Sequence, residues 1–236
     1  MKKIRYVFIL FLFIGISSYS FSWAGILKRD DFQDQKSWWD WGSTCTSFPS
    51  VFDGVAYLIL ESADSNRDCG TYLWDGENIY EYYTANIRVK TLTPMRPGTR
   101  GWGFWDYHPP MGPNETIDAD VSWFMQQYDP FNSSQTWWLA FTRNGETWDR
   151  NASSLDSIVD SEEWHTYTIE RREDYVAFSV DGILFHVSDS ALPEGLQSFH
   201  LWVDNFIYAF DPTLPITYRG FSNPSSLVVD FIEIYD

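Results

Sequence analysis

The chain has 236 residues and a formal net charge of −17 at pH 7. So acidic a surface repels nucleic acid and anionic lipid, which excludes both as expected partners and favours a neutral ligand. Aromatic residues make up 19% of the chain, enough for some rings to serve in binding as well as in packing.

Residues 1–24 are typical of a secretory signal peptide. Three basic residues precede an apolar run at 7–16, which is shorter than the roughly 20 residues a spanning helix needs. A small-x-small pattern then predicts cleavage after Ala24, with an uncleaved membrane anchor as the other interpretation. We therefore expect residues 25–236 to form one domain, secreted or periplasmic and without stable membrane insertion. Its 13 basic and 33 acidic side chains give a net charge of −20.

The next feature is a series of short runs rich in Val, Ile, Tyr, Phe and Trp, separated by Gly, Pro, Asn and Asp. This is the strand-and-turn pattern of an all-β protein, and the spacing favours two antiparallel sheets in a sandwich or jelly roll. The Asp181-Gly182 pair between two apolar runs predicts a tight hairpin. The strands are expected at 55–61, 80–91, 101–107, 117–124, 136–142, 165–171, 175–180, 183–187, 199–203 and 227–235.

Cys45 and Cys69 are the only two cysteines. In an exported protein an isolated pair is expected to form a disulfide. A zinc site is the weaker alternative, because there is no CxxC motif and no nearby His.

Several tryptophans fall outside an obvious core phase and are candidates for stacking on the flat faces of sugar rings. Packing in the core or in turns is the competing interpretation for each of them. The candidates are Trp38, Trp39, Trp41, Trp102, Trp105, Trp123, Trp137, Trp138 and Trp202.

An ordered set of motifs resembles glycoside hydrolase family 16, the laminarinase and lichenase group. The resemblance covers most of residues 50–236 and implies a concanavalin-like jelly roll with a concave sheet lined by 80–90, 101–107 and 117–124. The motifs are CGT at 69–71, YEYYTANIRVK at 80–90, GWGFW at 101–105, IDADV at 117–121, WHTYTIE at 164–170, FSVDG at 178–182 and LVVDFIEIY at 227–235.

The family's catalytic strand carries three acids on one face, and the matching positions here are Thr116, Asp118 and Asp120. A retaining glycosidase needs a carboxylate nucleophile and an acid/base on opposite sides of the glycosidic bond. A threonine hydroxyl cannot form the carboxylate ester, so the resemblance implies a degenerate catalytic motif. We expect Asp118 and Asp120, with Ser122 continuing their face, to contact ligand. A solvated acidic face is the alternative.

Other positions of the family's groove also match residues of this chain. Together with the aromatic candidates, they give the expected ligand contacts: Asn86, Arg88, Trp102, Trp105, Thr116, Trp123, His165, His200 and Trp202.

The family often binds a structural Ca²⁺ through the terminal strand and an early turn. The matching positions are Asp230 and Gly54, and oxygen ligands suit that ion. A plain turn and a capped strand end are the alternative interpretation, and no cofactor is otherwise required.

The sequence thus predicts a secreted protein that binds a neutral β-linked polysaccharide or oligosaccharide in an aromatic and acidic groove. An active glycoside hydrolase that uses Asp118 and Asp120 as a rearranged acid pair is the first alternative. A lyase or a structural envelope protein is the second.

Overall fold

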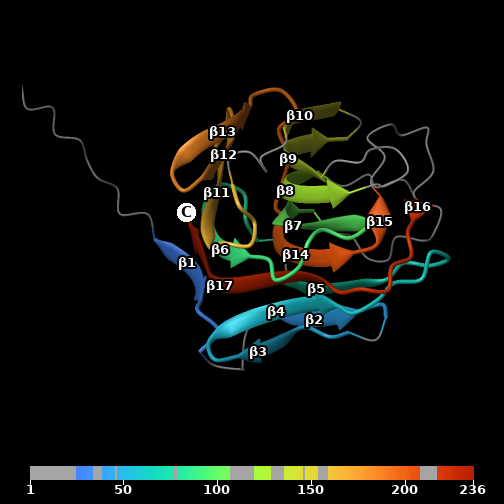
Figure 1. The fold of residues 1–236 in the computed structure, drawn as a ribbon. Helices are drawn as coiled ribbons and strands as arrows, with labels where there is room; N and C mark the ends of the chain where they lie inside the picture. The colour runs from blue at the N-terminus through green and yellow to red at the C-terminus, as the bar shows by residue number, and fades with distance from the viewer. Residues whose placement is uncertain are drawn as a thin grey trace, which may run out of the picture.

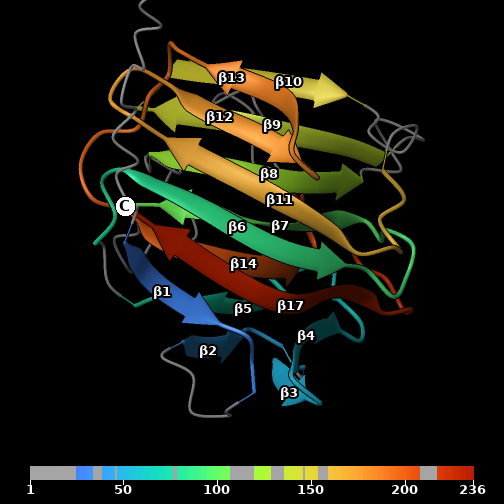
Figure 2. The same cartoon turned by 90° about the vertical axis from the view of Figure 1, so that its left-hand side faces the viewer.

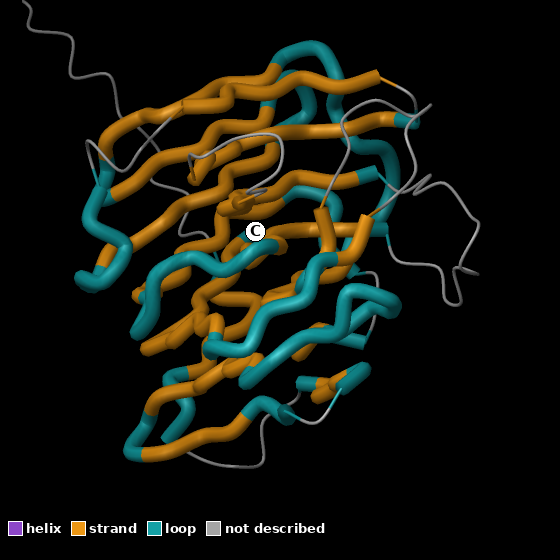
Figure 3. The backbone as a smooth tube through the Cα atoms, turned by 45° about the vertical axis from the view of Figure 1, so that its right-hand side comes forward, coloured by secondary structure: helices purple, strands orange, loops and turns teal. Residues whose placement is uncertain are grey.

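The computed structural model describes residues 25–33, 39–45, 47–76, 79–106, 120–128, 136–145, 147–153, 159–207 and 217–236. Every regular element in these ranges is a β-strand (Figure 3). Alternating apolar and polar residues, rich in β-branched and aromatic side chains, favour the pleated and half-buried surface of a sheet. Within the same ranges the structure has no helix long and apolar enough to cross a membrane.

The strands form two large antiparallel sheets that pack face to face (Figure 1). Figure 2 shows the eight-stranded sheet, called sheet A here, from its outer side. In spatial order sheet A contains β13 (Ile183–Ser188), β12 (Val176–Val180), β11 (His165–Arg171), β6 (Tyr83–Lys90), β17 (Ser225–Tyr235), β4 (Val55–Leu60) and β3 (Ser50–Phe52), with β1 (Ile26–Asp30) paired to β17.

The second sheet, sheet B, has seven strands, and a short two-stranded ribbon adjoins it. In spatial order sheet B contains β10 (Thr147–Ser153), β9 (Thr136–Asn144), β8 (Val121–Tyr128), β7 (Gly98–Trp105), β14 (Ser198–Asp204), β5 (Gly70–Trp74) and β2 (Asp40–Ser43). The ribbon pairs β15 (Phe206–Ile207) with β16 (Thr217–Tyr218). The predicted all-β sandwich of the concanavalin-like jelly-roll type is therefore confirmed.

The core lies between the two sheets and is dominated by aromatic rings. Tyr83 of β6 stacks on Phe104 of β7 with ring centroids 3.4 Å apart, and Trp102 of β7 meets Tyr167 of β11 edge-on at 4.6 Å. Each of these side chains is at most 1% exposed. Aromatic rings bury more apolar area than any other side chains, so these contacts hold the sheets together.

The structure corrects the expected composition of the sheet that would line a groove. Residues 83–90 form β6 of sheet A, between β11 and β17, whereas β7 and β8 belong to sheet B. The chain thus crosses from sheet A to sheet B between β6 and β7. Pro94 and Pro97 lie in this connection and lack the N–H groups that a continuing ladder would need.

Cys45 and Cys69 form a disulfide with Cα atoms 5.1 Å apart, as predicted. It links the chain beyond β2 to the start of β5, two neighbouring strands at one edge of sheet B.

The residues at the two ends of the described chain also meet. The Gly25 N–H donates to the Asp236 carboxylate, and the Asp236 N–H donates to the Gly25 carbonyl at 3.3 Å. This contact continues the β1–β17 ladder, in which Ile26 lies opposite Tyr235.

Candidate functional site

The face of sheet B that is directed away from sheet A, called the open face here, carries a second apolar cluster. On β8 the open-face positions are Val121, Trp123 and Met125, while Ser122 and Phe124 point into the core. Leu139 and Phe141 of β9 extend the same cluster. These five side chains are at most 3% exposed, so they form a floor beneath more exposed neighbours.

Partly exposed aromatic residues lie against this floor. Trp105 contacts Trp123 at 5.1 Å and His200 at 5.0 Å, measured between ring centroids. Trp202 contacts Trp123 at 4.9 Å, and Trp148 contacts Phe141 at 5.7 Å. We call the connected set the aromatic platform: Trp105, Trp123, Phe141, Trp148, His200 and Trp202.

Glycines determine how the platform rings lie. A Cβ atom at Gly101 would be 2.7 Å from Cζ2 of Trp202, and one at Gly103 would be 2.8 Å from Cδ1 of Trp123. The two indoles therefore occupy the space above the β7 backbone that side chains would otherwise fill. Of the two, Trp202 is partly exposed and Trp123 is buried.

The platform crosses several strands. Its members come from β14, β7, β8, β9 and β10, which are successive neighbours in sheet B. With strands about 4.8 Å apart, these four spacings cover roughly 19 Å. Tyr72 and Trp74 of β5, with centroids 5.1 Å apart, continue the aromatic surface on the other side of β14. The partly exposed members of the platform lie on β14, β7 and β10, while Trp123 of β8 and Phe141 of β9 are buried between them.

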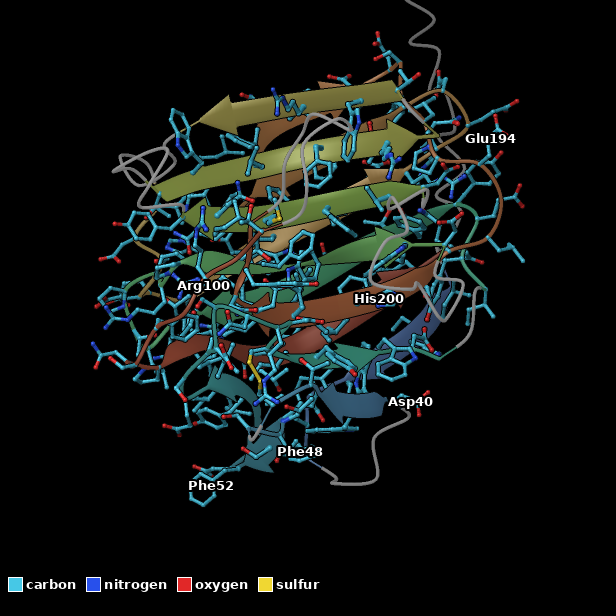
Figure 4. All side chains as sticks on the ribbon, turned by 90° about the vertical axis from the view of Figure 1, so that its right-hand side faces the viewer. Asp40, Phe48, Phe52, Arg100, Glu194 and His200 are labelled. Atoms are coloured by element: carbon cyan, nitrogen blue, oxygen red, sulfur yellow. A yellow bond between two sulfur atoms is a disulfide. The ribbon has the colours of Figure 1, made fainter. Side chains whose placement is uncertain are left out.

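His200 lies near the centre of the open face (Figure 4). It is 7% exposed, and its Nε2 lies 2.6 Å from the Ser198 hydroxyl oxygen. Burial lowers the pKa of His200 to about 3. The imidazole is therefore neutral at physiological pH, and it can offer a hydrogen bond but no charge to a ligand.

Asp204, two residues beyond Trp202 on β14, is a polar residue of the open face that the sequence interpretation did not include. Its Oδ1 accepts hydrogen bonds from the Thr99 hydroxyl at 2.6 Å and the Thr99 amide at 3.2 Å. The Phe206 amide donates to the same oxygen at 3.0 Å. Burial raises the pKa of Asp204 to about 8, against the Thr99 hydrogen bond and with the help of the Asp68 charge. The period-two alternation from Trp202 is the signal that would have placed Asp204 on this face.

Asp120 has a structural set of partners at the start of β8. Its two carboxylate oxygens accept the Gly145 amide at 2.9 Å and the Glu194 amide at 2.8 Å. Its own amide donates to the Asp106 carboxylate at 2.7 Å. Ser122, expected to continue an open acidic face, is fully buried on the core side, so that expectation is wrong. Thr116 and Asp118 lie outside the described residues.

Trp102 is part of the core and not of the open face, which corrects its expected place in the groove. It is fully buried and packs against Trp138 at 5.9 Å as well as against Tyr167. Trp138 and Trp39 are buried in the same core, and Trp41 packs against it. Trp105, Trp123, Trp137 and Trp202 do belong to the open-face cluster, while Trp38 lies outside the described residues.

Asn86, Arg88 and His165 lie in sheet A, apart from the platform, because β6 and β11 belong to that sheet. The Asn86 side-chain oxygen accepts the Thr168 hydroxyl at 2.7 Å. His165 Nδ1 lies 2.6 Å from the Asp181 carboxylate. Burial acts to raise the pKa of Asp181, but the His165 and Thr166 hydrogen bonds outweigh it and lower that pKa.

The two positions that the resemblance implied for Ca²⁺ make other contacts in the structure, and the calcium site itself stays a prediction. The Asp230 carboxylate accepts a hydrogen bond from Arg88 at 2.7 Å, so a guanidinium already neutralises it. Gly54 lies in the turn between β3 and β4 with a φ of 70°, as a plain turn requires. The part of the chain that the structure describes contains no cluster of three or more His, Cys, Asp or Glu side chains suited to a metal.

Comparison with solved structures shows which fold this is. The catalytic domain of an endo-1,3-β-glucanase (laminarinase) from Thermotoga petrophila matches with a TM-score of 0.60 and 15% identity, over 90% of this chain and 98% of that one. A κ-carrageenase from Pseudoalteromonas carrageenovora matches with a TM-score of 0.60 and 16% identity, over 88% and 92%. A Bacillus licheniformis β-glucanase matches with a TM-score of 0.57 and 18% identity, over 88% and 96%.

No protein-family model matches the sequence, and the search of curated proteins found no match. The matches to solved structures confirm the resemblance to the jelly-roll fold of glycoside hydrolase family 16 at the level of the fold.

Proposed function

We propose that this protein binds a neutral β-linked polysaccharide on the aromatic platform of sheet B and does not hydrolyse it. The observation that carries the proposal is the set of partly exposed tryptophans on the open face, Trp105, Trp148 and Trp202, of which Trp202 lies over Gly101. Sugar rings present flat C–H faces that stack on such rings, and a few polar groups then fix their orientation. The structural neighbours, named as glucanases and a carrageenase, support a glycan as the ligand class.

The identity of the residues on β8 supports the non-hydrolytic half of the proposal. Its described open-face positions are Val121, Trp123, Met125 and Gln127, which contain no carboxylate. Asp120 has both carboxylate oxygens engaged by backbone amides. An acid that is held in this way stabilises a turn and is poorly placed to exchange protons with a substrate.

The test compares binding and product release on the same polymers. Calorimetry and a reducing-sugar assay would be run on laminarin, lichenan, agarose and κ-carrageenan, with wild type, Trp202→Ala and Trp105→Ala. We expect wild type to bind a neutral polymer and each variant to bind it about tenfold more weakly, equivalent to about 1.4 kcal/mol.

Trp164→Ala is the matched control, because Trp164 lies beside Arg88 and Lys90 of sheet A rather than on the open face. Its affinity should equal that of wild type. Retaining hydrolysis by wild type would favour the alternative of an active glycoside hydrolase. Failure to bind any glycan would contradict the role of the platform.

We further propose that the protein is exported and that its leader is removed between Ala24 and Gly25. Hydrolysis of that peptide bond adds water, leaving a carboxylate on Ala24 and an ammonium group on Gly25. The Gly25 nitrogen already lies against the Asp236 carboxylate, so the new positive charge would face a negative partner. N-terminal sequencing of the exported protein should begin at Gly25. Exported protein that still begins at Met1 would contradict cleavage.

A further inference from the structure

We propose that Thr99 and Asp204 are positioning residues that lock the indole of Trp202 in its ligand-stacking orientation. This inference rests on the proposed function and specifies how one part of the platform is set. It starts from a chain of two hydrogen bonds. The Trp202 Nε1–H donates to the Thr99 hydroxyl oxygen at 2.9 Å, and the Thr99 hydroxyl donates to the Asp204 Oδ1 at 2.6 Å.

The direction of this chain is fixed by chemistry. An indole N–H can only donate, so the Thr99 oxygen must act as the acceptor for Trp202. The single hydroxyl hydrogen of Thr99 is then available for one acceptor, and Asp204 supplies it. The shared Oδ1 also accepts the amides of Thr99 and Phe206, which fixes the carboxyl group itself to β7 and β15.

Two packing contacts complete the restraint on the ring. Gly101 lies under the six-membered ring of Trp202, where a Cβ atom would be 2.7 Å from Cζ2 and 2.9 Å from Cη2. Trp123 lies beside it with ring centroids 4.9 Å apart. The indole is thus held at its nitrogen by Thr99, below by Gly101 and at its side by Trp123. Its remaining surface is partly exposed.

A locked ring matters because ordering a side chain on binding costs free energy, about 0.5–1.5 kcal/mol for a side chain with many rotamers. A ring that already has the stacking orientation avoids that cost. Trp202 would therefore contribute to affinity by contacting the sugar, and Thr99 and Asp204 would contribute by holding Trp202 in place.

The experiment replaces Thr99 by Val, which keeps the shape but removes both hydrogen bonds of the hydroxyl. Thr99→Ser keeps the hydroxyl and serves as the rescue variant. Hydrogen exchange of the Trp202 indole N–H, followed by NMR on protein labelled with ¹⁵N-tryptophan and assigned with Trp202→Phe, reports on the lock without any glycan. Calorimetry with the neutral polymer that wild type binds reports on affinity.

We expect the indole N–H to be protected in wild type and Thr99→Ser and to exchange faster in Thr99→Val. The affinity of Thr99→Val should fall about fivefold, the equivalent of one hydrogen bond, and Thr99→Ser should restore it. Urea unfolding of each variant identifies any loss of folded protein, and affinities are compared per folded molecule.

The results separate two kinds of failure. If wild type binds no glycan, the proposed function fails and the effect on affinity fails with it, while the exchange data still decide whether the lock exists. If wild type binds but Thr99→Val binds equally well, or keeps its indole N–H protected, the inference about Thr99 and Asp204 is wrong and the proposed function stands.

Discussion

His200 and Asp204 flank Trp202 on the open face of β14, and burial displaces their pKa values in opposite directions. His200 has a pKa of about 3, and Asp204 has one of about 8. Both side chains are therefore neutral near pH 7. The stacking surface around Trp202 thus carries no ionised group from either residue, although the protein as a whole is strongly acidic.

This assignment predicts how stability depends on pH. The pKa of Asp204 is raised from about 3.9 in the unfolded chain to about 8, so its stabilising effect is complete below pH 4 and declines as the pH rises to 8. The decline is at most about 1.4 kcal/mol per pH unit. Asp204→Asn cannot ionise and should lack it.

Urea unfolding at pH 5, 6, 7 and 8 measures this difference. Relative to wild type, Asp204→Asn should become progressively more stable as the pH rises. His200 is present in both proteins and loses its stabilising effect as the pH falls below 6.5, so it cancels in the comparison. A constant difference between the two proteins would show that Asp204 titrates normally.

For single residues, the sequence identifies candidate aromatic side chains more reliably than it identifies the face of the strand on which each one lies. Trp102 and Trp105 were both expected on the binding face, yet they are an odd number of residues apart on β7 and point to opposite sides. Because both faces of β7 and β8 are largely buried, neither strand shows the alternation of polar and apolar residues that identifies an open face. Only the register with the neighbouring strands shows which side faces the core.

Among the strands, β7 can support the aromatic platform because two of its open-face positions are glycines. Gly101 and Gly103 are open-face positions, and their missing side chains make room for Trp202 and Trp123. Gly103 also has a φ of 150°. A strand that is weakened by two glycines is thus the element on which the platform depends.

Gly103→Ala is expected to destabilise the protein by about 2–4 kcal/mol, because a Cβ would lie 2.1 Å from the Ser122 carbonyl oxygen and the backbone conformation is unfavourable for alanine. Urea unfolding measures the loss. Gly182→Ala is the control, since Gly182 also has a positive φ, of 76°, but nothing within 4 Å of the added methyl group. It should cost only about 1 kcal/mol. Equal losses in the two variants would show that crowding at Gly103 is unimportant.

Strand prediction was most successful where side chains alternate clearly. The pattern of β6 places Tyr83, Ala85, Ile87 and Val89 inward, and the pattern of β4 is equally regular. The strands without a prediction, such as β2 and β3, are only four and three residues long. Their existence depends on the neighbours that pair with them, Trp74 opposite Asp40 for example, and local sequence does not reveal such partners.

For the whole molecule, the sandwich could be predicted from strand spacing, but the assignment of strands to sheets could not. Consecutive strands β4, β5, β6 and β7 alternate between sheets A and B. Because of this alternation, Asn86 and Arg88 lie in sheet A, apart from the open-face tryptophans of sheet B with which they were expected to form one groove. Asp230 lies at a bulge between Val229 and Phe231, and its carboxylate pairs with Arg88 of the neighbouring strand β6.

The contact between Gly25 and Asp236 has a practical consequence for attaching the protein to a support. Both residues belong to the sheet A side of the sandwich, whereas the platform lies on the far side of sheet B (Figure 1). A tether at either residue would therefore anchor the molecule by its back and leave the tryptophans directed outward. Many copies immobilised in this way on one bead would share an orientation, so a long polymer could bridge several of them and be retained by avidity even if each single contact is weak.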